Sequence, residues 1–318
     1  MSLRMQIAKL LDLVFGAGLI IAPYNNGGEK MQDLSLLTWK EIKELDKEKS
    51  IVFAVMAPIE EHGLHLPLAT DLIEGEHWCK AAMSVIEDAS DVKCFYLPSF
   101  PIASASVNEF YGSVHFTMRT TYEVSYGIME SLRFMGFVNI VIIASHADPQ
   151  HLIAVERAVR KINRKYGTCS FAPMGQIFMG EGVKMPSELE SFEKEHADDY
   201  HAGWVETSSL LALDKDLVRD GFKDIPDSDI SERDMIFRKK QLSAMGEYGH
   251  LGLPRLASGK LGKQLNDNCS GSIADAVLKF YNRDGYQRYE HYSLYKILPL
   301  HIGFLGLFGR VRRRKVTG

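Results

Sequence analysis

Strand-like runs alternate with longer helix-like segments from residue 50 onward, and this alternation limits the folds open to the chain. The run 50–57, SIVFAVMA, is apolar and rich in β-branched residues, and NIVIIA at 139–144 is the most strand-like run of all. Further strands are expected at 93–97 and 169–173, and helices at 72–87, from Thr120 or Thr121 to about Phe134, and at 150–166. Such alternation predicts an α/β fold with a mainly parallel sheet flanked by helices on both faces.

Composition excludes several classes of partner and site. With 318 residues, 46% of them hydrophobic, the chain can bury a substantial core in one large domain or two small ones. A formal charge of −4 gives no general attraction to acidic polymers, so we expect neither nucleic acid nor a membrane as partner. The four cysteines are widely spaced and form no C-x-x-C pair, which argues against a thiolate zinc site and fits a cytoplasmic protein.

Both ends of the chain carry apolar stretches. The stretch 13–22, LVFGAGLIIA, is too short to span a bilayer, which needs roughly 20 apolar residues. The stretch 294–308 is followed by a cluster of arginines and a lysine up to residue 315. We expect an N-terminal extension at 1–32 and a C-terminal apolar and basic extension at 281–318. The second is interpreted as a subunit-contact arm, with binding to a membrane surface as the alternative.

Metal-binding side chains follow the ends of two expected strands. They are Glu60, His62 and Asp71 in PIEEHGLHLPLATD, and His146 and Asp148 in ASHADPQH. Because ligand sites in parallel sheets lie beyond the carboxyl ends of the strands, the two clusters are expected to meet. Two histidines and three carboxylates without sulfur suit Zn, Mn or Fe(II), and a central carboxylate could bridge two ions. For each residue taken singly, a solvated loop acid or a core histidine is the alternative.

The loop 58–71 is similar to the E-Q-H-G-P-H-L-P-L-x-T-D signature of the creatininase, or creatinine amidohydrolase, family. Glu61 stands in place of Gln and Leu64 in place of Pro. Further segments resemble the family in the same order: DLSLLTWKEI, FYGSVHFT, ASHADP, HAGWVETS and GHLGLPRLAS. The resemblance spans about residues 33–280, which we expect to form a creatininase-like, metal-dependent hydrolase domain.

The resemblance also implies cofactors and their ligands. Two divalent metal ions, of Zn, Mn or Fe, are expected. By position, Glu60 and His146 would hold one ion. His62 and Asp148 would hold the other, with Asp71 bridging the two. Asp148 stands where creatinine-hydrolysing members carry Glu, so an acid is kept at this place.

The remaining candidates would act on the substrate. His201, in the HAG segment, would be the catalytic histidine. Glu206 is placed with it, either as a carboxylate that orients a ligand or as an acid favoured by a helix N-terminus. Ser104, Ser106 and Asn108, after the second expected strand, are candidate substrate-binding residues, and ordinary loop polarity is the alternative.

The implied activity is hydrolysis of a C–N amide bond, cyclic or formyl, in a small polar molecule by a metal-activated water. The tryptophan-rich lid of true creatininases is not evident, because Trp204 follows His201 instead of preceding it, so creatinine itself is not the expected substrate. An enzyme similar to a formylaminopyrimidine nucleotide deformylase and a non-catalytic metal-binding protein are the alternatives. Ring-like or hexameric assemblies in the family imply a homo-oligomer.

Overall fold

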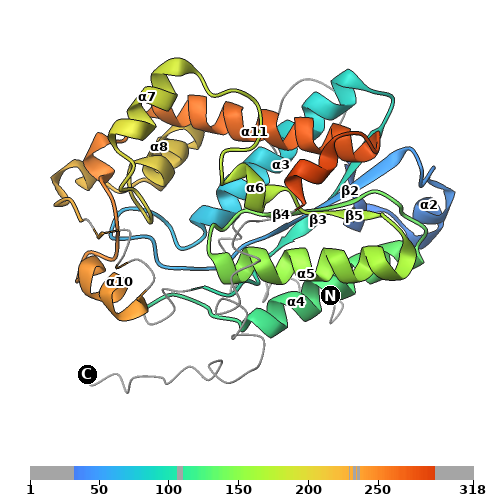
Figure 1. Cartoon of the computed structure of the whole chain (residues 1–318), viewed down its shortest axis with the longest axis horizontal. Coiled ribbons are helices and arrows are strands. Elements are labelled where there is room, and N and C mark those ends of the chain that lie inside the picture. Colours follow the sequence, from blue (N-terminus) through green and yellow to red (C-terminus); the bar gives the residue numbers. More distant parts are fainter. Residues whose placement is uncertain (1–31, 106–109, 229, 232–233, 235–236, 291–318) are drawn as a thin grey trace, which may run out of the picture. The chain divides into compact units, whose positions relative to one another are not determined.

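The computed structural model of the chain describes residues 32–105, 110–228, 230–231, 234 and 237–290. Within them, one sheet has the strand order β1-β3-β2-β4-β5, and each neighbouring pair is parallel (Figure 1). The strands are β1 (Gln32–Asp33), β2 (Ser50–Met56), β3 (Lys93–Phe100), β4 (Ile140–Ala144) and β5 (Ser170–Phe171). The expected α/β fold with a parallel sheet is confirmed.

Helices connect the strands and cover the sheet. The connecting helices are α3 (Thr70–Ala89), α4 (Met118–Phe134) and α5 (Pro149–Tyr166). In Figure 1, α4 and α5 lie together on one face of the sheet, and α3 lies with α11 (Gly259–Tyr281) on the other. The shorter elements are α2 (Trp39–Glu44), α6 (Met174–Ile177), α7 (Ser187–Glu195), α8 (Trp204–Leu213), α10 (Arg238–Met245) and the 3-10 helices η1 (Leu34–Leu36), η2 (Lys215–Leu217), η3 (Phe222–Asp224), η4 (Pro254–Leu256) and η5 (Tyr286–Tyr289).

The strands β2 and β4 lie at the centre of the core. Every residue in them is buried. Because helices cover both faces of the sheet, these strands are continuous apolar runs and do not alternate between apolar and polar residues. Their observed bounds, 50–56 and 140–144, each differ by one residue from the ranges expected from the sequence.

The chain reverses its direction across the sheet between β2 and β4, which are neighbours. From β2 it passes through α3 to β3 on one side, and from β4 it passes through α5 to β5 on the other. The segments that leave the carboxyl ends of β2 and β4 therefore diverge to opposite faces and open a crevice between them. Both segments that carry the candidate metal ligands leave the sheet at this point.

The N-terminus of α4 differs from the expected one. Thr117 is the N-cap, and its Oγ1 accepts the main-chain N–H of Thr120 at 3.0 Å. The backbone of Thr117 is extended, which the cap position requires, whereas Thr120 and Thr121 are already helical. Residues 117–121 contain three threonines, and each could cap a helix, so the local sequence does not show which of them is the N-cap.

Most of both expected extensions lies outside the described residues. Of 1–32, only Gln32 is described, and 291–318, with the apolar and basic tail, is not. No helix in the part of the chain that the structure describes is long and apolar enough to cross a membrane.

The start of the C-terminal extension packs against the core. α11 ends at Tyr281, and η5 follows it. Tyr286 and Tyr289 of η5 are buried, and their rings lie 6.0 and 6.4 Å from the ring of Phe171 in β5. These contacts are edge-to-face, which favours their packing beyond the area that they bury.

A close contact joins α11 to α8. A Cβ atom at Gly262 of α11 would lie 1.7 Å from the main-chain oxygen of Ser208 in α8. Further along α11, Asn266 Oδ1 accepts hydrogen bonds from Trp78 Nε1 of α3 and from Ser209 Oγ of α8, each at 2.7 Å. α11 therefore holds α3 and α8 together, and both of these helices carry candidate site residues.

Substituting Gly262 tests this contact. Gly262→Ala should lower the free energy of unfolding by about 1–3 kcal/mol, because the methyl group meets main chain that no side-chain rotation can move. Gly271→Ala in the same helix is the matched control, since its Cβ would meet only a Val183 methyl group at 3.5 Å. Helix propensity should make that control neutral or up to about 1 kcal/mol more stable. Urea unfolding followed by circular dichroism measures both, and equal stability of the two variants would contradict the close approach.

Candidate metal centre

The loop between β2 and α3 supplies the first donors. Glu60 donates its main-chain N–H to Leu68 O at 2.9 Å, which closes the loop, and Gly63 adopts the left-handed conformation at φ +66° within it. Asp71 follows in the first turn of α3, where the helix dipole favours a negative charge. Glu60, His62 and Asp71 are 0%, 1% and 2% exposed, so these charged and polar groups are removed from water.

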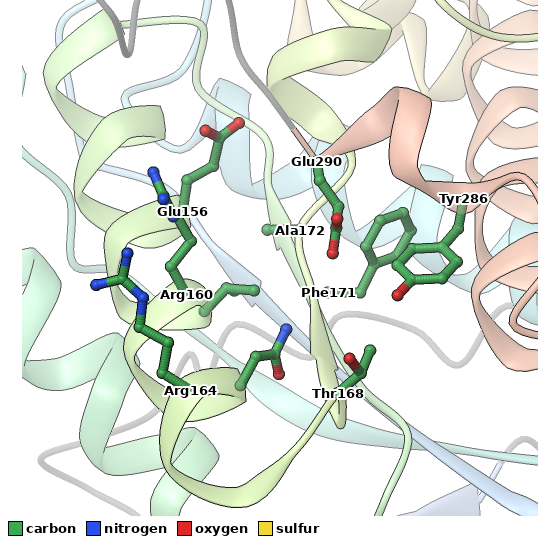
Figure 2. Close-up of a pocket in the computed structure, with 10 residues that line it drawn as sticks. Glu156, Arg160, Arg164, Thr168, Phe171, Ala172, Tyr286 and Glu290 are labelled. Atoms are coloured by element: carbon green, nitrogen blue, oxygen red, sulfur yellow. The ribbon is translucent and has the colours of Figure 1, made fainter.

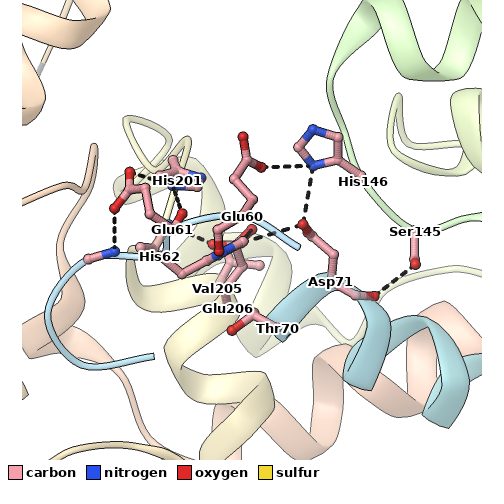
Figure 3. A network of polar contacts seen from close by, with 12 residues as sticks. Glu60, Glu61, His62, Thr70, Asp71, Ser145, His146, His201, Val205 and Glu206 are labelled. Atoms are coloured by element: carbon pink, nitrogen blue, oxygen red, sulfur yellow. Dashed lines mark hydrogen bonds and ion pairs between the residues drawn. The ribbon is translucent and has the colours of Figure 1, made fainter. Parts of the chain in front are cut away.

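His146, just after β4, completes one group of donors. Its Nδ1 lies 3.5 Å from Glu60 Oε2 and 3.4 Å from Asp71 Oδ2 (Figure 3). Neither carboxylate oxygen of Glu60 has a hydrogen-bond partner among the described residues. Because an uncompensated buried carboxylate is costly, this arrangement calls for a cation between the three side chains.

A second group forms around His62. Its Nε2 lies 3.7 Å from Asp71 Oδ2 and 3.8 Å from Glu206 Oε1. Its Nδ1 lies 2.9 Å from the main-chain oxygen of Glu60. A hydrogen bond donated from Nδ1 leaves the lone pair of Nε2 facing the carboxylates, which is the state that a metal ligand requires. Asp71 is common to both groups, and a third group of potential donors joins Glu60, His62 and His201.

Burial and charge act in opposite directions on these side chains. Burial raises the pKa of Glu60. Burial alone would also raise the pKa of Asp71, but His146 and His62 hold it well below its usual range. Burial would lower the pKa of His146, yet Glu60 and Asp71 raise it to about 10. The carboxylates therefore favour positive charge at this place, and divalent cations would supply it while the imidazoles stay neutral.

Asp148 lies beside His146 but caps a helix. Its Oδ1 accepts the main-chain N–H groups of Gln150 and His151, at 2.7 and 3.4 Å, at the start of α5. Among the described residues, no group of three potential metal donors includes Asp148. Of the five ligands expected from the sequence, the structure brings four together and leaves Asp148 outside the groups.

Glu206 occupies the position next to His62 instead. It lies in the first turn of α8, and its Oε2 accepts the main-chain N–H of Ala202 at 2.6 Å. Its other oxygen, Oε1, faces His62. Both roles considered for Glu206 are thus compatible with its place, since it is an acid near a helix N-terminus and a carboxylate facing a candidate ligand.

His201 lies next to His62, at a ring-centroid distance of 4.6 Å. Its Nε2 lies 2.8 Å from the main-chain oxygen of Glu61 and 3.4 Å from Glu61 Oε1. Burial would lower the pKa of His201, but the contact with Glu61 raises it overall. Glu61 therefore makes protonation of His201 easier than it would be for a histidine in water, beside the metal donors.

Of the candidate substrate-binding residues, only Ser104 is described. It is 1% exposed, and its Oγ has no hydrogen-bond partner among the described residues. It follows β3, the neighbour of β2, at the same edge of the sheet as the metal donors. Ser106 and Asn108 lie outside the described residues.

Two buried groups near the centre were not singled out from the sequence. His151, in the first turn of α5, has its ring 5.8 Å from that of His146, and burial lowers its pKa to about 3. Glu74, one helical turn after Asp71, is 3% exposed. Burial and the charge of Glu206 raise the pKa of Glu74 well above its usual range. The spacing of His151 from Asp148, and of Glu74 from Asp71, on one helix face was the available signal.

A cavity of about 270 Å³ lies elsewhere, between α5, β5 and η5 (Figure 2). Its lining includes Arg160, Arg164, Thr168, Phe171 and Tyr286. None of the metal donors described above belongs to it. The candidate site is therefore chosen by the clustering of buried metal donors and not by this cavity.

Known proteins resemble this chain in sequence pattern and in fold. The sequence profile of the family described as "Creatininase: Creatinine amidohydrolase" matches residues 35–277. No curated protein matches in a direct sequence comparison. A creatininase mutant complexed with creatine superposes with a TM-score of 0.64 at 20% identity, covering 79% of this chain and 99% of its own.

Two further solved structures superpose over the same shares of the two chains. One is described as "Creatininase Mn", with a TM-score of 0.63 at 21% identity, and the other is a creatininase mutant of "Zn-Zn type", with 0.63 at 18%. Identities this low show the shared fold alone, whereas the family profile covers more than half of the sequence. By fold and by sequence profile together, the chain belongs to the creatininase family.

Proposed function

We propose that this chain is a dinuclear metal-dependent amidohydrolase. It would hydrolyse the C–N bond of a cyclic or formyl amide in a small polar molecule. The observation that carries the proposal is the position of Asp71, a buried carboxylate shared by two groups of metal donors. Members of the family are metal-dependent amidohydrolases, and structural neighbours are described as Mn and Zn-Zn forms, which supports this choice.

The donors fit two divalent cations. One ion would be held by Glu60, Asp71 and His146. The other would be held by His62, Asp71 and Glu206. Imidazole and carboxylate donors without sulfur suit Zn, Mn or Fe(II). Several donor atoms of this set are buried without a hydrogen-bond partner among the described residues: both oxygens of Glu60, Asp71 Oδ2 and His62 Nε2.

The chemistry divides between the ions and the chain. When bound, two such cations would lower the pKa of a water from ~15.7 towards ~7 and polarise the amide carbonyl. His201, whose pKa is raised, lies next to His62 and would donate a proton to the leaving nitrogen. Glu61 keeps the ring of His201 in place through its main-chain oxygen and its carboxylate. The burial of Glu60 and Asp71 keeps bulk water from the donors.

A role in metal storage alone fits the site less well. The two proposed sets of ligands leave out His201, although this partly buried side chain also lies within reach of Glu60 and His62 and has a pKa raised by Glu61. A group that can give up a proton next to the metals has a use in catalysis and none in storage. A cytoplasmic location and a homo-oligomer remain predictions for this enzyme, as expected from the sequence.

Substitution of the carboxylates tests the ligand sets. Wild-type protein purified without chelators and resupplied with Zn or Mn should contain two ions per chain by elemental analysis. Asp71→Asn should lower both occupancies, because both groups share this residue. Glu206→Gln should remove chiefly one ion, whereas Asp148→Asn should keep both ions and most of the stability, because Asn caps a helix about as well as Asp.

Comparing the Asp148 and Glu206 variants shows which of these two acids is a ligand of the second ion. If Asp148→Asn loses an ion and Glu206→Gln keeps both, Asp148 belongs to the second site and must leave its cap position to reach it. If the resupplied wild type contains no metal at all, the dinuclear proposal is wrong.

Substitution of His201 separates catalysis from storage. His201→Ala should keep both ions and the fold but lose about 10²–10⁴ in turnover, the usual contribution of a general acid. Hydantoin-like rings, formylaminopyrimidines and creatinine form the substrate panel. His77→Ala, a half-buried histidine of α3 outside the donor groups, is the matched control. Wild-type turnover by His201→Ala on a verified substrate would overturn the role of His201 and leave the metal site standing.

A further inference from the structure

One carboxylate near the candidate metal centre accepts hydrogen bonds from main-chain N–H groups of two separate segments. Asp199 Oδ1 accepts the N–H of Trp204 and the N–H of Leu253, each at 2.9 Å. Its Oδ2 accepts the N–H of Val205 at 2.9 Å. Trp204 and Val205 open α8, and Leu253 ends the loop 249–253. Asp199 therefore joins the N-terminus of α8 to this loop.

The place of this carboxylate depends on two glycines. A Cβ atom at Gly203 would lie 1.8 Å from Asp199 Oδ1, and one at Gly252 would lie 2.2 Å from it. Gly252 also has φ +154°, which side chains rarely adopt. The glycines of the HAG and GHLG segments thus make room for Asp199. This accounts for two motifs of the sequence that the metal ligands alone do not explain.

The two segments that Asp199 joins carry His201 and Glu206. His201 exchanges main-chain hydrogen bonds with Leu251, at 2.9 and 2.8 Å. Between His201 and α8, Ala202 has the left-handed φ of +49° and donates its N–H to Glu206 Oε2. A non-glycine residue holds this conformation only where its surroundings determine it. The bonds of Asp199 to Trp204 and Val205 on one side of Ala202, and those of His201 to Leu251 on the other, provide that constraint.

We propose that Asp199 is a positioning residue of the metal centre, which holds Glu206 and His201 in place through the main chain of α8 and of the loop 249–253. The inference rests on the proposed function, because Glu206 matters here as a ligand of the second ion. A helix cap with no influence on the site is the competing explanation. The two differ in whether the loss of Asp199 weakens one metal site selectively.

The test is a titration of the metal-free full-length protein with Co²⁺, followed by visible absorption and by competition with a chelator. Wild type should bind two ions. Asp199→Ala should weaken the second ion by about 100-fold and Asp199→Asn by about 10-fold, the range found when a supporting partner of a ligand is removed. The Asn variant should lose less because its carbonyl oxygen can still accept from Trp204 and Leu253. The absorption of the second Co²⁺ should shift in both variants, while the first ion is unaffected.

Asp214→Ala is the matched structural control. Asp214 caps η2 at the other end of α8, where its Oδ1 accepts the N–H of Asp216 at 2.9 Å. This variant should lower the melting temperature and leave both Co²⁺ affinities unchanged. If Asp199→Ala does not fold, Asp199→Asn decides alone.

The possible failures can be told apart. Equal losses at both ions, or unchanged affinities in the Asp199 variants, overturn the positioning role and leave the proposed function intact. A wild-type protein that binds no second ion overturns the proposed function, and the role of Asp199 with it.

Discussion

The structure depends on how two acids, Glu60 and Asp71, are accommodated in a place without water. Two carboxylates buried at 0% and 2% exposure cost several kcal/mol each unless opposite charge compensates them. His62 and His146 supply nitrogen donors at distances of 3.4–3.7 Å, but a neutral imidazole brings no charge. Divalent cations bound there would resolve this conflict, because they would compensate the acids and leave the histidines neutral. The sheet contributes by directing the segments after β2 and β4 towards the same crevice.

Some parts of this arrangement could be predicted from the sequence for physical reasons. Central parallel strands are buried on both faces, so 50–56 and 140–144 are continuous apolar runs that few other structures produce. Side chains just beyond such strands share one edge of the sheet, which is why the sequence alone groups Glu60, His62 and His146. The resemblance to the creatininase family then gave Asp71 its place between them.

Other parts could not be predicted, because they depend on contacts between distant segments. Asp148 and Glu206 are both acids close to a helix N-terminus, and only the packing of α8 decides that Glu206 faces His62. Asp199 stands beside Asp198 in the sequence, yet only Asp199 meets the main chain of residue 253. No local pattern distinguishes these two neighbouring acids, since one is selected by a loop more than fifty residues away.

The donors of the centre are spread widely along the chain, and this has a thermodynamic consequence. Glu60 and Glu206 lie 146 residues apart in the sequence, so an unfolded chain does not hold the full set together. Any ion that binds only the folded form shifts the folding equilibrium by mass action, by about 1.4 kcal/mol for each tenfold excess of free metal over its dissociation constant. The supply of metal would then govern how much folded protein a cell maintains, in addition to how active each molecule is.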